Sequence, residues 1–200
     1  MVNATVLEDA GDAGSSQPQP HPPTPTSFIY LALYDFLAED DAVDEWLPDQ
    51  LSWRLIPSES PTIPREQHEV FGIYCDSETS EVSSDTQLID DPIEDIRAFI
   101  RLPVKSTRSY ESLVDRVQTC SETLVNEAIE DGWQEWEWVY NVFEHLEVLE
   151  YLDDRVTNTW QYTNKSKMET FKERVLNLAK QVFEMHVPPE DRVIDFPLGP

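Results

Sequence analysis

Apolar side chains recur at helical spacing through the C-terminal half of the chain. Residues 110–129 and 133–152 each keep intervals of three and four between large apolar residues, and so do residues 171–185. This spacing places the apolar side chains on one face of a helix and predicts three amphipathic stretches. The third has a clear start, because Ser166-Lys-Met-Glu169 is a capping box. Gly132 separates the first two, so one bent helix and a helical hairpin remain alternatives.

The N-terminal half carries a weaker pattern. Apolar positions at helical spacing favour a helix over 28–46, but the unbroken apolar run over 28–34 also fits a buried strand. Asp91-Pro92-Ile93-Glu94 combines an N-cap acid, a proline in the first turn and a glutamate three residues after the cap. That combination predicts a helix that ends before Pro103.

Two short segments have the pattern of strands. Residues 51–56 alternate apolar and polar side chains, and residues 70–75 are rich in β-branched and aromatic residues. Together they are expected to form a small two-stranded element near 51–75. The polar, acidic residues 76–90 are expected to form a mobile loop.

The expected organisation is one domain preceded by a tail. Residues 1–27 are rich in proline and poor in large apolar groups, which predicts a disordered acidic tail. Residues 28–196 are expected to form a single globular domain of the mainly α, helix-rich class, with α+β as the variant if the two-stranded element forms. The apolar residues 193–197 are expected to dock back on this domain.

Acidic residues outnumber basic ones by 40 to 14, which gives a formal charge of −26. Residues 1–60 carry 11 acids and one base, and residues 111–160 carry 13 and two, whereas the last forty residues carry six of each. Such a surface repels bare nucleic acid and anionic membranes and attracts basic protein surfaces. The charge therefore indicates a basic protein partner, with a nucleic-acid-binding protein among the candidates. The oligomeric state stays open.

Targeting signals and enzyme motifs are missing from the sequence. The N-terminus resembles no signal peptide, and with two cysteines in 200 residues we expect a soluble protein of the cytoplasm or nucleus. Five glycines leave little material for a phosphate-binding loop, and the four histidines have no metal-ligand spacing. We therefore expect no catalytic, cofactor-binding or metal site. An enzyme with an unrecognised carboxylate site is kept as an alternative.

A stripe of acids follows the second helical stretch. Glu130, Glu137 and Glu144 are seven residues apart, and Glu147 and Asp154 lie close to their face. Carboxylates three or four residues apart on a helix have Cβ atoms about 5–6 Å apart. That spacing is close to the spacing of successive phosphates in a nucleic acid strand. The stripe is the predicted partner-binding face, and solvation alone is the simpler explanation for it.

Trp138 stands among these acids. Trp133, Trp136 and Tyr140 share one helical face and are expected in the core, whereas Trp138 points elsewhere at 100° per residue. An exposed tryptophan beside acids would be a binding hot spot. Core packing of the whole aromatic cluster is the competing interpretation.

These observations predict a non-enzymatic intracellular interaction protein whose acidic helical surface docks on a basic partner. A sharper alternative is a nucleic-acid mimic that inhibits a DNA- or RNA-binding protein. The two hypotheses share the same electrostatics and differ in whether nucleic acid competes for the partner.

Overall fold

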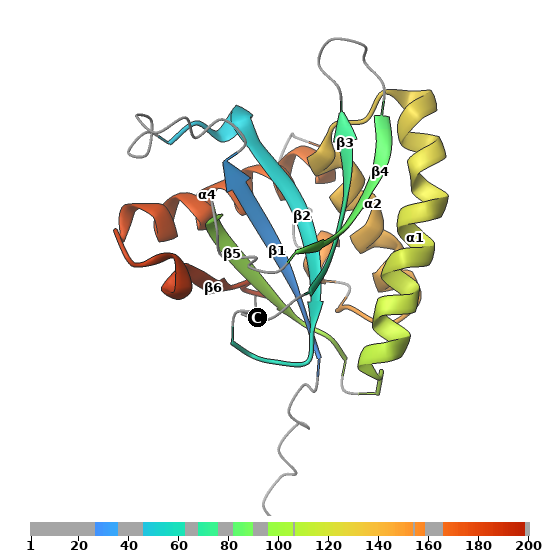
Figure 1. Ribbon diagram of the computed structural model, residues 1–200, viewed down its shortest axis with the longest axis horizontal. Coiled ribbons are helices and arrows are strands. Elements are labelled where there is room, and N and C mark those ends of the chain that lie inside the picture. The colour runs from blue at the N-terminus through green and yellow to red at the C-terminus, as the bar shows by residue number, and fades with distance from the viewer. Residues whose placement is uncertain are drawn as a thin grey trace, which may run out of the picture.

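The computed structural model describes residues 27–35, 46–62, 68–75, 82–89, 96–105, 107–153, 155–158 and 166–198. Within these ranges six strands form one sheet of order β4-β3-β2-β1-β5-β6 (Figure 1). Neighbouring strands are antiparallel except for β5 and β6, which are parallel. The strands are β1 (Phe28–Asp35), β2 (Leu51–Ser58), β3 (His68–Cys75), β4 (Val82–Ile89), β5 (Ile96–Pro103) and β6 (Val193–Asp195).

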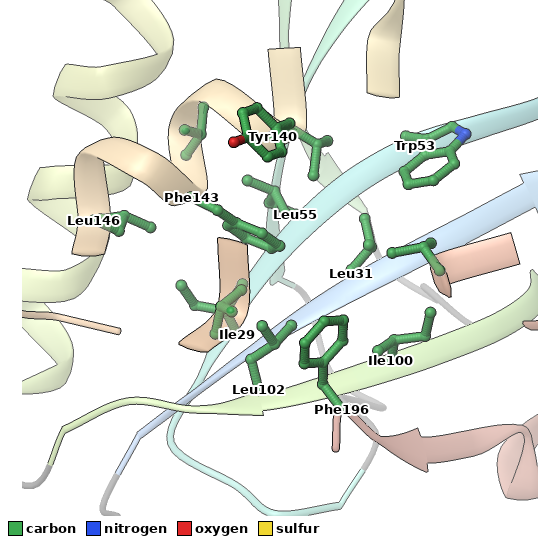
Figure 2. Close-up of a cluster of buried hydrophobic side chains, with 14 of the residues drawn as sticks. Ile29, Leu31, Trp53, Leu55, Ile100, Leu102, Tyr140, Phe143, Leu146 and Phe196 are labelled. Atoms are coloured by element: carbon green, nitrogen blue, oxygen red, sulfur yellow. The ribbon is translucent and has the colours of Figure 1, made fainter. Parts of the chain in front are cut away.

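Helices cover one face of this sheet (Figure 1). They are α1 (Tyr110–Asp131), α2 (Glu135–Val148), the short α3 (Arg155–Asn158) and α4 (Lys167–Glu184), and two 3-10 turns, η1 (Pro48–Gln50) and η2 (Pro189–Asp191), flank strands. Buried side chains of α1, α2 and α4 join those of the sheet in one large hydrophobic core. In Figure 2 apolar residues of β1, β2 and β5 meet the aromatic and leucine side chains of α2, with Phe196 beside them.

The central strand β1 is buried on both faces. Its odd-numbered residues, such as Ile29 and Leu31, face the helices, whereas Tyr30 and Ala32 belong to a second cluster on the opposite side of the sheet. All four side chains have 0% exposure. A strand buried on two sides has no polar alternation, which explains the unbroken apolar run in the sequence.

The mainly α prediction is therefore wrong. The preferred helix over 28–46 is contradicted over residues 28–35, which form β1, while residues 36–45 lie outside the described residues. The alternative of a buried strand over 28–34 is correct. Continuous apolar sequence satisfies a helical period by coincidence, because every position is apolar whichever period is tested.

Two further predictions fail in the middle of the chain. The helix expected after Asp91-Pro92 is contradicted from residue 96 onward, where β5 forms and Ala98, Ile100 and Leu102 face the helices, while residues 91–95 lie outside the described residues. The acidic loop expected over 76–90 contains β4, which pairs with β3 along its whole length. As a strand at the edge of the sheet, β4 has no second neighbour among the described residues and carries little apolar sequence.

The C-terminal predictions are confirmed. Gly132 adopts a left-handed conformation, with φ of 66°, at the end of α1, so α1 and α2 form a helical hairpin rather than one bent helix. The capping box at Ser166 starts α4. Residues 193–195 dock as β6, and Phe196 is buried. The strands expected over 51–56 and 70–75 lie within β2 and β3, but they belong to a six-stranded sheet and not to a small two-stranded element. Residues 1–26 of the expected tail lie outside the described residues.

Candidate functional site

Two acids of the predicted stripe serve α2 itself. Glu137 completes a capping box, and its Oε2 accepts the main-chain N–H of Gln134 at 2.6 Å. Glu144 Oε1 accepts the phenol of Tyr140 at 2.7 Å. Burial, and then this hydrogen bond, raise the pKa of Tyr140 above its usual range. Both carboxylates are half-buried groups that hold the helix rather than freely projecting charges.

The other predicted residues do not complete a common face. Glu147 accepts hydrogen bonds from the N–H of Thr157, at 2.6 Å, and from its hydroxyl, which ties α2 to α3. Glu130 is exposed, but it lies on α1, on the other side of the turn at Gly132. Asp154 lies outside the described residues. Residues seven apart share a face only within one continuous helix. Because the chain turns at Gly132, Glu130 does not lie on the same face as Glu137 and Glu144.

Trp138 is not a surface residue. Its side chain has 0% exposure, so the predicted exposed hot spot is wrong and the competing core interpretation is correct for this residue. The reason is that α2 contacts the sheet together with α1, α3 and α4, so that a wide arc of the helix is buried. The indole of Trp136, by contrast, is only partly buried.

The exposed acidic surface lies on α1 instead. This helix contains a single basic residue, Arg116, and all of its acidic side chains are exposed: Glu111, Asp115, Glu122, Glu127, Glu130 and Asp131. Glu111, Asp115, Glu122 and Glu130 lie on the side opposite the buried residues Leu113, Val117 and Leu124, and we call these four the acidic ridge. At 1.5 Å per residue the ridge is about 28 Å long.

A second feature is a gap between β2 and β3. Within the described strands a single pair, Leu55 with Phe71, joins them. Nearer the start of β2, side chains replace the neighbouring strand: the N–H of Trp53 donates to Glu135 Oε2 at 2.7 Å, and its carbonyl accepts from Arg54 Nη1 at 3.0 Å. Arg54 and Glu135 also form an ion pair at 3.0 Å, here called the gap ion pair.

Local sequence explains how this pair is accommodated. Glu135 is the first residue of α2, where the helix dipole stabilises a carboxylate, and its Oε2 also accepts the hydroxyl of Ser52 at 2.9 Å. Gly72 leaves the space that Arg54 crosses. A Cβ at Gly72 would overlap Cδ of Arg54 and lie 2.8 Å from its Nε. The pair thus depends on a glycine inside β3.

We expect Gly72→Ala to lower the free energy of unfolding by about 1–3 kcal/mol, because the added methyl group displaces the Arg54 side chain from a filled site. Urea denaturation followed by circular dichroism measures the change. In an Arg54→Ala background the same substitution meets no Cδ and should have almost no effect. An equal loss in both backgrounds would show that Gly72 serves the backbone rather than Arg54.

The gap opens into a pocket beyond the ion pair. The pocket has a volume of about 400 Å³ and is bounded by η1, the start of β2, the end of β3, the start of α2 and one residue of α4. Its walls combine aromatic rings, carboxylates, amides and one ammonium group. Its lining includes Asp49, Leu51, Tyr74, Glu135, Trp136 and Lys172.

A cation already lies against one wall of this pocket. The ammonium of Lys172 is 4.8 Å from the centre of the Trp136 ring, within the range of a cation–π interaction. The phenol-bearing side chain of Tyr74, at the end of β3, is 42% exposed. Such a pocket can bind a polar or cationic group by stacking and hydrogen bonding.

Sequence reasoning overlooked this site because Glu135 is one of 40 acidic residues. Two signals pointed to it. Gly72 interrupts the β-branched and aromatic pattern of β3, and Arg54 is the charged residue within the mainly apolar sequence of β2. A glycine in one strand and a buried charge in its neighbour indicate a close approach between them.

Comparison with known proteins adds no relative. The chain matches no family model, no curated protein and no solved structure. In the described part of the chain no group of three histidine, cysteine, aspartate or glutamate side chains is placed to hold a metal ion. The helices described there are too short or too polar to cross a membrane.

Proposed function

We propose that this protein is a non-enzymatic binding protein that docks on a basic protein through the acidic ridge of α1. The observation that carries the proposal is the charge of that helix, in which all acidic side chains are exposed and only one basic residue is present. Like charges one turn apart, such as Glu111 and Asp115, destabilise a helix by about 0.2–0.5 kcal/mol per pair. A basic partner would turn this cost into attraction.

The whole-chain charge supports the same proposal. A formal charge of −26 attracts a basic partner over several ångströms and raises the association rate, and salt screens this attraction. Along α1 the acidic ridge has intervals of about 6, 10 and 12 Å. These unequal intervals favour docking on a basic protein surface over imitation of evenly spaced phosphates.

Charge reversal on the ridge tests the proposal. We expect the double variant Asp115→Lys/Glu122→Lys to bind basic partners at least about tenfold more weakly, because each reversed contact costs on the order of 1 kcal/mol. Partners are captured from cell lysate with the full chain, identified, and then measured singly with purified proteins. Binding of the wild-type chain should weaken strongly between low salt and about 0.5 M salt.

A matched variant controls for total charge. Glu190→Lys/Asp191→Lys makes the same charge change at η2, where both side chains are exposed. This variant should keep binding within about twofold of the wild type. An equal loss of partner binding in both double variants would show that net charge alone drives binding. Unchanged binding of Asp115→Lys/Glu122→Lys would show that the acidic ridge is not the docking face. Competition by duplex DNA for the captured partner would support the mimic instead.

A further inference from the structure

The main chain of β2 faces the pocket at Leu51. The N–H and carbonyl of Trp53 both point into the gap, toward Glu135 and Arg54. In a strand, main-chain groups of every second residue point to the same side. The carbonyl of Leu51, two residues earlier and also at the wall of the pocket, therefore points into the same gap. The Leu51 carbonyl is therefore the next hydrogen-bond acceptor on this edge of β2, two residues before the Trp53 carbonyl that Arg54 uses.

Arg54 shows which chemical group the gap accommodates. Its Nη1 contacts both the main-chain carbonyl of Trp53 and Oε2 of the Glu135 carboxylate, each at 3.0 Å. The pocket offers the same two kinds of acceptor, because its lining includes Leu51, whose carbonyl points into the gap, and the exposed Asp49. A planar fork of N–H donors fits a carbonyl and a carboxylate side by side better than a single ammonium does.

We propose that this pocket binds a guanidinium group, namely an arginine side chain of the basic partner. The inference rests on the proposed function, because that function supplies a partner rich in basic residues. The guanidinium donates to Asp49 and to the Leu51 carbonyl and stacks against Tyr74, whose ring is exposed at the pocket wall. The bound guanidinium would lie beside that of Arg54, on the same edge of β2.

The charges around the pocket set the strength of this site. Glu135 is already paired with Arg54, and Asp49 is the other acid that lines the pocket among the described residues, none of which forms an ion pair with it. Lys172 opposes an incoming cation, although its ammonium is held on the Trp136 ring. An arginine side chain alone is therefore bound weakly, and removing the charge of Lys172 strengthens the site.

The test uses L-argininamide as the probe for the full chain. Nuclear magnetic resonance of the tryptophan and tyrosine side chains should show saturable shifts at Trp136 and Tyr74. L-citrullinamide, whose side chain carries no charge, should give no such shifts, and L-lysinamide should bind at least about fivefold more weakly because it lacks the planar fork. Equal binding of argininamide and lysinamide, or the absence of saturable shifts, would overturn the proposal.

Matched variants separate the pocket from general electrostatics. Asp49→Asn should weaken argininamide binding at least about fivefold, whereas Asp115→Asn, the same change on the acidic ridge, should leave it unaltered. Lys172→Met should strengthen binding about threefold, whereas Lys180→Met, with its exposed side chain on the same helix, should not. If Asp49→Asn and Asp115→Asn, or Lys172→Met and Lys180→Met, changed argininamide binding equally, the effect would come from the total charge of the protein, and the proposed arginine site would be refuted.

The two proposals fail independently. The ridge variant Asp115→Lys/Glu122→Lys should lose the partner and still bind argininamide at the pocket. If argininamide binds but that variant keeps its partners, only the proposed docking face is wrong. If the ridge variant loses its partners while the wild-type chain shows no saturable argininamide shifts, only the arginine pocket is wrong.

Discussion

Replacing Arg54 by methionine should lower the free energy of unfolding by about 3 kcal/mol, because the substitution leaves one half of a buried ion pair behind. Arg54 is 6% exposed, and its guanidinium serves both the Trp53 carbonyl and the Glu135 carboxylate. After the change the carboxylate keeps two donors, from Trp53 and Ser52, so the loss falls at the lower end of the range for broken buried pairs. Urea denaturation followed by far-ultraviolet circular dichroism measures it.

An exposed ion pair provides the control. Lys180 and Glu184 are 3.6 Å apart, and their side chains are 51% and 61% exposed. Lys180→Met should change the stability by no more than about 0.5 kcal/mol. The double variant Arg54→Met/Glu135→Gln should be more stable than Arg54→Met alone, because no unpaired charge remains in the gap. A loss below about 1 kcal/mol in Arg54→Met would mean that water, not the ion pair, satisfies the gap.

The three long helices, α1, α2 and α4, could be predicted because each buries apolar residues at helical spacing. In α4 the apolar residues lie on a single stripe and the capping box marks the start, so local signals and tertiary packing agree. In β2 both faces are buried, but Leu51, Trp53 and Leu55 toward the helices alternate with the polar residues Ser52 and Arg54, so its period of two was recognisable. Where one side of an element is buried, the sequence carries the period of that element.

The strands that were missed lack such a contrast. β1 is buried on both faces, so its sequence contains no polar positions that would reveal a period of two. At the edge of the sheet, β4 has exposed residues on both faces, including Ser83, Ser84 and Thr86, and contains almost no apolar signal. Only β5 carried a pattern that could have been recognised, because Arg97 and Arg101 alternate with Ile96, Ala98, Ile100 and Leu102. The proline at 92 outweighed that alternation.

The candidate site could not be predicted from acids alone. Forty acidic residues make any chosen stripe easy to find by chance, and only the structure shows that Glu137, Glu144 and Glu147 serve as hydrogen-bond acceptors inside the domain. Charge alone does not distinguish a carboxylate that holds a helix from one that meets a partner. That distinction depends on which N–H and O–H groups lie within reach.

Substitution of Trp138 by alanine should lower the free energy of unfolding by about 4 kcal/mol, because it leaves a large cavity where α2 meets the rest of the core. The side chain is fully buried, and Trp138 is the largest fully buried residue in the part of the chain that the structure describes. An exposed binding residue would behave in the opposite way, since its removal would weaken partner capture without changing stability. Denaturation by urea, followed by circular dichroism, distinguishes the two because it does not depend on tryptophan emission.

Two companion variants identify the source of the loss. Val148→Ala lies on the same helix with 82% exposure and should change stability by no more than about 0.5 kcal/mol. Trp138→Phe should lower the free energy of unfolding by only about 1 kcal/mol. The smaller ring leaves a cavity, but the substitution also removes a buried indole N–H that has no acceptor among the described residues, and this gain offsets part of the loss. If Trp138→Ala were as mild as Val148→Ala, the tryptophan would lie at the surface, and its predicted role as a binding hot spot would return.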